Sequence, residues 1–197
     1  SGKVCIVTGA GHGIGRAHAL ELAKHGAQVV VNDLGTSVTG DGADEKAADL
    51  TVELITQRGG TAVASYDDVS DYEAAGRMVA QAVEAFGRLD VLVNNAGIVR
   101  DSAIWNMSEA DFDSVITVHL KGSWAPSHWA ARHWRDRAKA GESFTGRIIN
   151  TTSGAGLVGN FGQSNYATAK AGIAGLTQTL SLELHKLGVT VNAVGPA

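Results

Sequence analysis

The feature that most constrains the fold is a regular alternation of short apolar runs, rich in valine and isoleucine, with longer stretches of helical periodicity. The apolar runs span residues 3–8, 28–33, 61–66, 90–95, 147–152 and 189–194. They are almost continuously apolar, which is typical of strands buried on both faces of a sheet. The helical patterns between them span residues 14–25, 43–58, 71–86, 108–140 and 165–187.

Strands separated by helices of this length predict a parallel sheet, because each crossover helix returns the chain to the same end of the sheet. We therefore expect an α/β fold with helices on both faces of the sheet. Either Ser70 or Asp71 is expected to cap the third helix, and Ser108 the fourth. The 197 residues suit a single domain over positions 1–197.

Composition limits the kinds of partner that we expect. The net charge of −4 offers no electrostatic attraction for nucleic acid or for an anionic membrane surface. No apolar run approaches the roughly 18 residues of a membrane helix. The single cysteine, Cys5, excludes an internal disulfide and favours a reducing cytoplasm. His128 and His133 point different ways on a helix, and no HExxH or CxxC motif occurs, so we expect no metal site.

A glycine-rich segment, TGAGHGIG, directly follows the first apolar run and opens the first helix. Its glycines permit positive φ angles and let the backbone approach a pyrophosphate at the helix N-terminus, where unpaired N–H groups favour negative charge. The histidine adds a partial positive charge. Taken alone, the segment is also compatible with plain turn chemistry. We predict that Gly9, His12, Gly13, Ile14 and Gly15 bind the phosphates of a dinucleotide.

An acidic residue, Asp33, ends the second apolar run 18 residues after the last of these glycines. A carboxylate about 20 residues beyond the motif binds the adenosine ribose hydroxyls of NAD and repels the 2′-phosphate of NADP. Neither Asn32 nor Leu34 supplies the arginine that NADP would require. NAD is therefore the predicted cofactor, with a solvated loop acid as the alternative for Asp33.

The third and fourth apolar runs also end in residues that suit a cofactor. Asp68 can accept a hydrogen bond from the adenine amine, and Val69 can pack against the ring, whereas Asp67 is expected to be only solvated. The segment NNAG, at 94–97, either bridges strand-end backbone groups or borders the cofactor, and taken alone it is equally compatible with a turn. We expect Asn95, Ala96 and Gly97 to lie at the cofactor.

A tyrosine and a lysine, Tyr166 and Lys170, lie four residues apart and so share one face of the last helix. For tyrosine to act as a base near pH 7, its pKa must fall by about 3 units, or about 4 kcal/mol. An ammonium about 4 Å away, at an effective dielectric constant near 20, supplies about 4 kcal/mol. Ser153, which follows the fifth apolar run, can donate a hydrogen bond to the substrate oxygen.

A helix tyrosine beside a lysine is common without any catalysis. What favours chemistry here is that the glycine segment, the acids and Ser153 all fall at the carboxyl ends of strands, where open parallel sheets bind ligands.

Together these motifs resemble the short-chain dehydrogenase/reductase family over essentially the whole chain. The matching elements are TGAGHGIG, Asp33, NNAG, and Ser153, Tyr166 and Lys170 in the spacing Ser-x12-Tyr-x3-Lys. The resemblance implies a doubly wound Rossmann fold with strand order 3-2-1-4-5-6, and a Lys170 that also binds the nicotinamide ribose. The sequence ends at GPA, so we expect the family's final strand and substrate lid to be missing from it.

The family's proton relay uses the main-chain carbonyl of an asparagine at a kink in the fourth crossover helix. Here that position is His119, within VHLKGSW, and the relay is left open by this departure. Because the family commonly pairs through this helix, the resemblance also implies a homodimer or homotetramer.

The segments NDLG, VHLKGS and GNFGQSNY resemble the branch that contains (3R)-hydroxyacyl-CoA dehydrogenase domains of peroxisomal multifunctional enzymes and similar actinobacterial-type enzymes. We therefore expect an NAD-dependent oxidoreductase acting on a small-molecule secondary alcohol or its ketone, with a 3-hydroxyacyl-CoA as a candidate. The alternatives are an NAD-binding sensor without turnover and a dehydrogenase of steroid or terpenoid alcohols.

Overall fold

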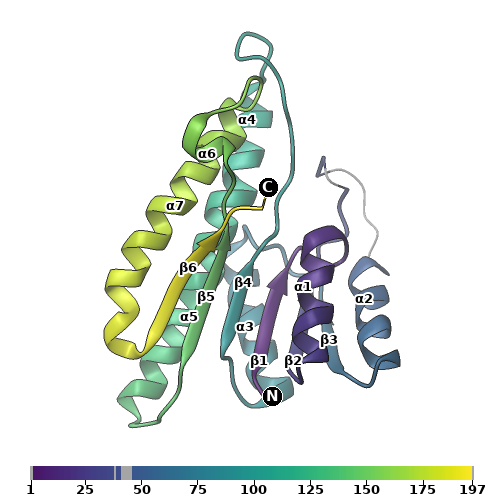
Figure 1. Ribbon diagram of the computed structural model, residues 1–197, viewed down its shortest axis with the longest axis vertical. Helices are drawn as coiled ribbons and strands as arrows, with labels where there is room; N and C mark the ends of the chain where they lie inside the picture. Colours follow the sequence, from purple (N-terminus) through teal and green to yellow (C-terminus); the bar gives the residue numbers. More distant parts are fainter. Residues whose placement is uncertain (1, 38, 41–45, 197) are drawn as a thin grey trace.

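The computed structural model describes residues 2–37, 39–40 and 46–196. Within them a parallel six-stranded sheet has the order β3-β2-β1-β4-β5-β6, as Figure 1 shows. The strands are β1 (Val4–Thr8), β2 (Gln28–Asn32), β3 (Thr61–Ser65), β4 (Val91–Asn94), β5 (Gly146–Thr151) and β6 (Val189–Val194). Each predicted run matches its strand to within one residue at either end, and the predicted fold class and strand order are confirmed.

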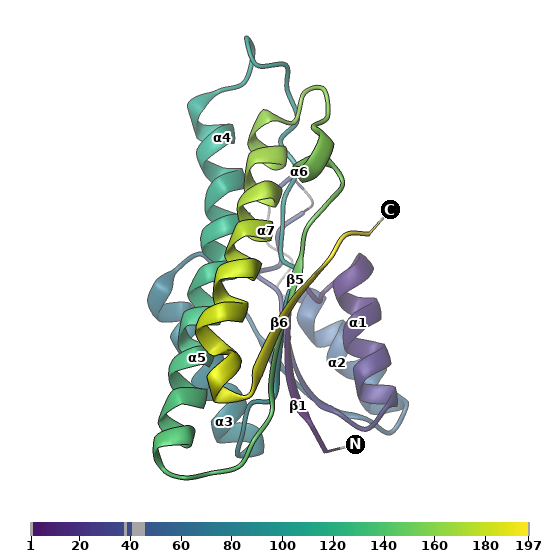
Figure 2. The ribbon, with the colours of Figure 1, turned by 60° about the vertical axis from the view of Figure 1, so that its left-hand side comes forward.

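Helices cover both faces of the sheet (Figure 2). One face carries α1 (Gly13–Lys24) and α2 (Lys46–Gln57), and the other carries α3 (Tyr72–Phe86), α5 (Gly122–Lys139) and α7 (Ser164–Leu184). Successive side chains of β1 alternate between the two apolar cores: Ile6 belongs to the core under α3 and α5, and Cys5 and Val7 to the core under α1 and α2. The central strand is therefore buried on both sides, as its continuous apolar run predicts.

Two helix starts follow the predicted caps. The Asp71 carboxylate accepts a hydrogen bond from the Ala74 amide at 2.6 Å, and the Ser108 hydroxyl accepts one from the Asp111 amide at 3.1 Å. Asp71 and not Ser70 is thus the cap of α3. The predicted first residues of α2, 43–45, lie outside the described residues.

The prediction of a single helix over 108–140 is wrong in one respect. The structure divides it into α4 (Glu109–Ile116), a π-helical turn η1 (Thr117–Lys121) and α5. A π turn inserts one extra residue into the helical ladder, which redirects the side chains around His119. The structure also adds a short helix α6 (Ala155–Val158) before α7, and a 3₁₀ turn η2 (His185–Leu187) after it.

Among the described residues, no helix combines the length and apolar character that crossing a lipid bilayer would need.

Candidate active site at the carboxyl ends of the strands

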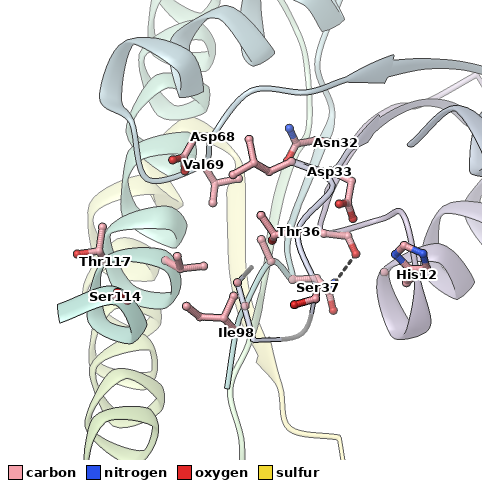
Figure 3. A pocket seen from close by; sticks show the side chains of 18 of the residues that line it. His12, Asn32, Asp33, Thr36, Ser37, Asp68, Val69, Ile98, Ser114 and Thr117 are labelled. Atoms are coloured by element: carbon pink, nitrogen blue, oxygen red, sulfur yellow. Dashed lines mark hydrogen bonds between the residues drawn. The ribbon is translucent and has the colours of Figure 1, made fainter. Parts of the chain in front are cut away.

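A cavity of about 980 Å³ lies at the carboxyl ends of the first four strands. Figure 3 shows His12 and Asp33 on one side of it, with Ser114 of α4 and Thr117 of η1 on the other. All the predicted cofactor residues outside α7 line it: Gly9, His12, Gly13, Ile14, Gly15, Asp33, Asp68, Val69, Asn95, Ala96 and Gly97. The structure therefore brings together residues from four separate loops.

Other lining residues were missed by the sequence reasoning. They come from the loop after β2, from the segment after β4 and from the α4–η1 junction: Thr36, Ser37, Gly40, Ile98, Arg100, Asp113, Ser114, Thr117 and Val118. These positions carry no fixed motif spacing, so only the folded chain reveals that they face the cavity.

The glycines of the first turn allow close backbone packing. Gly9 has φ +61°, and a Cβ there would lie 2.8 Å from the Cα of Ala96. A Cβ on Gly15 would collide with the Gly9 carbonyl oxygen. His12 precedes α1 in an extended conformation and makes no side-chain cap hydrogen bond. The first N–H groups of α1 are therefore available to an anion in the cavity.

The Asp33 carboxylate is held at the cavity wall by two backbone amides. One oxygen accepts a hydrogen bond from Gly11 N at 2.7 Å, and the other accepts one from Gly35 N at 2.8 Å. Each carboxylate oxygen keeps a further lone pair, so Asp33 can still accept hydroxyl groups of a ligand. It is therefore not merely a solvated loop acid.

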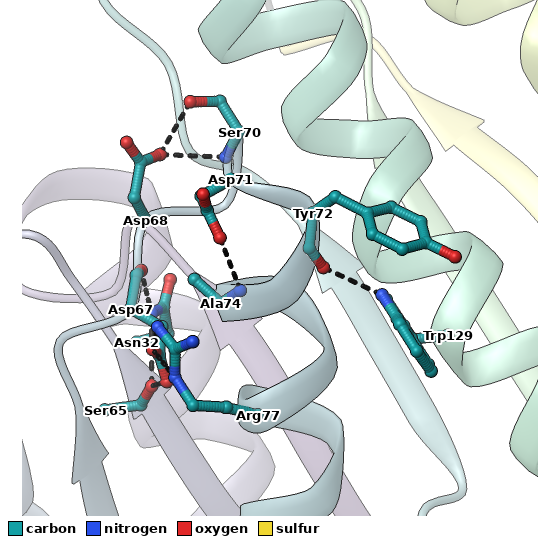
Figure 4. A network of polar contacts seen from close by, with 10 residues as sticks. All are labelled: Asn32, Ser65, Asp67, Asp68, Ser70, Asp71, Tyr72, Ala74, Arg77 and Trp129. Carbon is teal, nitrogen blue, oxygen red and sulfur yellow. Dashed lines mark hydrogen bonds and ion pairs between the residues drawn. The ribbon is translucent and has the colours of Figure 1, made fainter.

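Two neighbouring acids at the end of β3 differ in their partners (Figure 4). One Asp68 oxygen accepts hydrogen bonds from the Ser70 amide at 2.8 Å and hydroxyl at 2.7 Å. Asp67 forms an ion pair with Arg77 at 2.9 Å. The expectation that Asp67 is only solvated is thus wrong, because α3 brings a guanidinium next to it.

The NNAG segment joins two strand ends as well as bordering the cavity. The Asn95 side-chain amide donates to the carbonyl oxygens of Thr8 at 3.1 Å and Gly9 at 3.2 Å. In return, the Thr8 hydroxyl accepts hydrogen bonds from the Asn95 and Ala96 amides, both at 3.0 Å. Asn95 therefore bridges strand-end backbone groups, as one alternative predicted, and it also lines the cavity.

Tyr166 and Lys170 lie together on α7. Lys170 is 3% exposed and donates a hydrogen bond to the Thr151 carbonyl oxygen at 2.7 Å. Its ammonium nitrogen lies 5.4 Å from the centre of the Tyr166 ring, over the ring face. Burial lowers the pKa of Lys170 from 10.5 to about 8. The Tyr166 hydroxyl has no hydrogen-bond partner among the described residues.

The end of β5 is tied to the same turn of α7. The Thr152 hydroxyl donates to the Lys170 carbonyl oxygen at 2.9 Å, and Ser153 follows directly. The Ser153 hydroxyl accepts a hydrogen bond from the Ala155 amide at 3.3 Å, at the start of α6. A Cβ on Gly156 would lie 2.7 Å from the Ala171 amide nitrogen, so α6 packs closely on α7. The strand end that carries Ser153 is thus held beside the turn of α7 that carries Lys170. Ser153, Tyr166 and Lys170 do not belong to the lining of the cavity.

His119 lies between the cavity wall and Tyr166. It is 3% exposed at the centre of η1, and its Nε2 lies 2.8 Å from the Ile98 carbonyl oxygen. Burial and, to a lesser extent, the positive charge of Lys170 lower the pKa of His119 to about 4, so the ring is neutral near pH 7. Its main-chain carbonyl accepts a hydrogen bond from the Ser123 hydroxyl at 2.7 Å.

No group of three or more histidine, cysteine, aspartate or glutamate side chains is arranged to hold a metal ion within the part of the chain that the structure describes. The polar groups at the site are instead backbone amides, carboxylates, hydroxyls and one buried ammonium. This set suits a dinucleotide and an alcohol or ketone.

Comparison with known proteins gives a consistent result. The family model described as short chain dehydrogenase matches residues 3–197. A solved structure of a short chain dehydrogenase from Mycobacterium avium is 56% identical with a TM-score of 0.94, and the match covers all of this chain and 68% of that one.

Two curated relatives have more specific names. Peroxisomal multifunctional enzyme A from Dictyostelium discoideum is 50% identical over 98% of this chain and 42% of the relative. Hydroxyacyl-CoA dehydrogenase ChsB1 from Mycobacterium tuberculosis is 47% identical over the whole chain and 61% of the relative. The chain spans less than two thirds of the length of either relative.

Proposed function

The chain belongs to the short-chain dehydrogenase family, and from this premise we propose that it transfers a hydride between a secondary alcohol and NAD. The observation that carries the proposal is the buried Lys170 ammonium over the ring of Tyr166, which packs against His119 beside a cavity lined by every predicted dinucleotide residue outside α7. The name of one relative, hydroxyacyl-CoA dehydrogenase ChsB1, supports a 3-hydroxyacyl-CoA as the substrate, in preference to a steroid or terpenoid alcohol and to a sensor without turnover.

The residues of the cavity fit a nicotinamide dinucleotide. The open N-terminus of α1 and the close backbone approach at Gly9 suit a pyrophosphate. Asp33 suits the ribose hydroxyls of NAD and opposes the phosphate of NADP, so we propose NAD as the cofactor. Asp68 and Val69 are proposed to contact the adenine. When bound, the dinucleotide supplies the hydride acceptor or donor of the reaction.

The protein's own residues handle the proton. In the oxidative direction, Tyr166 takes the proton of the substrate hydroxyl as a general base. The Lys170 ammonium over its ring favours the negative charge that the phenol then carries. Because the pKa of Lys170 is about 8, most of it is protonated at pH 7. Ser153 donates a hydrogen bond to the substrate oxygen as charge develops on that atom.

We propose that His119 supports the exit of the proton through its main chain. Its carbonyl oxygen already accepts from Ser123, and an sp² oxygen has a second lone pair for a water molecule. The π turn around His119 is the kind of local distortion that accompanies functional sites in helices.

We also propose that the protein is a homodimer or homotetramer in a reducing cytoplasm. A largely apolar hollow of about 290 Å³ on the outer surface supports the pairing, and it is lined by Ile116, Leu120, Lys121, Trp124 and Leu176. Light scattering of the full-length protein tests the pairing, since a Trp124→Asp variant should dissociate. Cys5, a buried free thiol, is compatible with a reducing compartment.

The experiment compares full-length wild-type protein with Tyr166→Phe. Formation of reduced nicotinamide is followed by absorbance with 3-hydroxyacyl-CoA, steroid and terpenoid substrates, and cofactor binding is followed by fluorescence. We expect the variant to lose activity by 10²-fold or more, on the order of a general base's contribution, and to retain cofactor binding. An active variant would overturn the role of Tyr166. Binding of NAD without turnover of any substrate would favour the sensor.

A further inference from the structure

Five large apolar side chains, Ile104, Trp105, Leu157, Val158 and Phe161, remain 68–88% exposed. We call this group the apolar mouth. Its members come from only two segments, 99–108 between β4 and α4, and 154–163 between β5 and α7. A cluster of exposed apolar side chains on a soluble protein usually marks a binding surface.

The two segments of the apolar mouth are joined to each other. The rings of Trp105 and Phe161 meet edge to face with centres 6.4 Å apart. Three hydrogen bonds of 2.8 Å link the segments and the start of α7: Ser102 N to Gly162 O, Gln163 Nε2 to Asp101 Oδ2, and Asn165 Nδ2 to Arg100 O. Figure 1 shows both segments at the same end of the molecule, beside α4 and α6. The mouth is therefore one supported surface and not two separate loops.

The apolar mouth is continuous in the chain with the proposed catalytic residues. Leu157 and Val158 lie on α6, which begins two residues after Ser153. Phe161 precedes Tyr166 by five residues. None of the five apolar side chains lines the cofactor cavity. The mouth thus adjoins the proposed catalytic residues along the chain and lies outside the cofactor cavity.

We propose that the apolar mouth binds the hydrocarbon chain of the substrate, and that Trp105 and Phe161 determine a preference for long chains. This inference rests on the proposed function. The mouth offers wide apolar and aromatic surface, which suits an extended alkyl chain and not a charged group. Each methylene that it buries should raise affinity about fourfold, according to the free energy of transferring a methylene from water.

The test uses the full-length protein and a series of 3-hydroxyacyl-CoA substrates of increasing chain length. For Trp105→Ala and Phe161→Ala, we expect kcat/KM to fall about tenfold or more with long chains, mainly through KM, and to be unchanged with the shortest one. Leu182→Ala is the matched control, because Leu182 is 76% exposed on α7, outside the two segments of the mouth. Leu182→Ala should leave kcat/KM unchanged at every chain length.

Three outcomes would overturn the proposal: no effect of the variants, the same loss at every chain length, or a lower melting temperature without chain-length dependence. The last outcome would mean that another part of the protein covers the apolar mouth.

A binding experiment separates this inference from the proposed function. Titration of full-length Tyr166→Phe with saturated acyl-CoA esters should show affinity that rises with chain length, and the rise should disappear when Trp105→Ala is added. An affinity independent of chain length would overturn the proposed role of the apolar mouth, even if the wild type is active. A rising affinity together with no turnover by the wild type would overturn only the proposed function.

Discussion

The imidazole of His119 stands edge-on to the phenol ring of Tyr166, with ring centres 5.2 Å apart and planes at 84°. On its other side, the imidazole occupies the space that a Cβ on Gly97 would need. The cavity wall at Gly97, the π turn and the proposed catalytic tyrosine are therefore one packed unit. The position of the Tyr166 ring depends on residues from three separate parts of the chain.

The Nε2 atom of His119 lies between two backbone groups of Ile98. The Ile98 carbonyl oxygen, at 2.8 Å, can accept a hydrogen bond from a protonated Nε2, and the Ile98 amide, at 3.1 Å, can donate one to an unprotonated Nε2. Nδ1 is buried and has no hydrogen-bond partner within the described residues. A neutral ring avoids placing a second positive charge near Lys170.

His119→Phe should keep the edge-to-face contact and lose the hydrogen bond to Ile98. We expect the free energy of unfolding at pH 7 to fall by about 1–3 kcal/mol, because a buried backbone group of Ile98 loses its partner. The wild type should also lose up to about 3 kcal/mol as pH falls from 6.5 to 4, since the unfolded state binds a proton that folded His119, with its pKa of about 4, does not. Urea unfolding at several pH values measures both effects.

His119→Phe should lack this loss of unfolding free energy at acid pH. His185→Phe, at an exposed histidine, serves as the control and should show the same loss as the wild type. Parallel stability profiles for wild type and His119→Phe would show that His119 does not stay neutral in the folded protein.

Gly97→Ala should disturb the site by displacing the ring of His119. The added methyl would overlap His119, with 2.9 Å to Nδ1, and would push the ring towards Tyr166. We expect a loss of about 1–3 kcal/mol in the free energy of unfolding, together with lower kcat. Gly175→Ala is the control, because a Cβ there meets nothing within 4 Å and alanine favours the helix. Equal stability of the two variants would contradict the close packing.

Lys170→Met should abolish activity and yet stabilise the fold. Burial lowers the pKa of Lys170 to about 8, so keeping it charged at pH 7 costs up to about 3 kcal/mol. The unfolded state binds more protons between pH 8 and 10.5, so wild-type stability should rise over that range and the advantage of the variant should shrink. Thermal unfolding from pH 7 to 10.5 measures this, with exposed Lys139→Met as the control. A variant that is less stable at pH 7 would show that the hydrogen bond to Thr151 outweighs the burial cost.

Asp33→Asn should weaken the discrimination between the two nicotinamide cofactors. The amide keeps an oxygen for one of the two backbone amides that Asp33 binds, and removes the negative charge that repels a 2′-phosphate. We expect the ratio of the Kd values for NADPH and NADH to fall about tenfold or more, measured by cofactor fluorescence. Asp67→Asn removes another cavity charge, one that is paired with Arg77, and should leave the ratio unchanged. Equal effects would mean that the overall charge of the cavity, not Asp33, selects the cofactor.

The sequence by itself determined the strands and about half of the cavity lining, and its resemblance to a known family supplied the strand order. The apolar runs predict each strand to within a residue, and the short motifs that end them must gather at one edge of a parallel sheet. Asp33 and the NNAG segment were located in this way, because their positions follow from local pattern and chain direction alone.

Only the tertiary structure decided that the kink implied at His119 is a π turn, that Lys170 is buried and that Trp105 and Phe161 are exposed. A single extra residue in a helical turn leaves too small a trace in the 3.6-residue periodicity to be detected over 108–140. The burial or exposure of a side chain depends on which distant segment packs beside it. These features arise from contacts between parts of the chain that are far apart in sequence, and local pattern carries no record of such contacts.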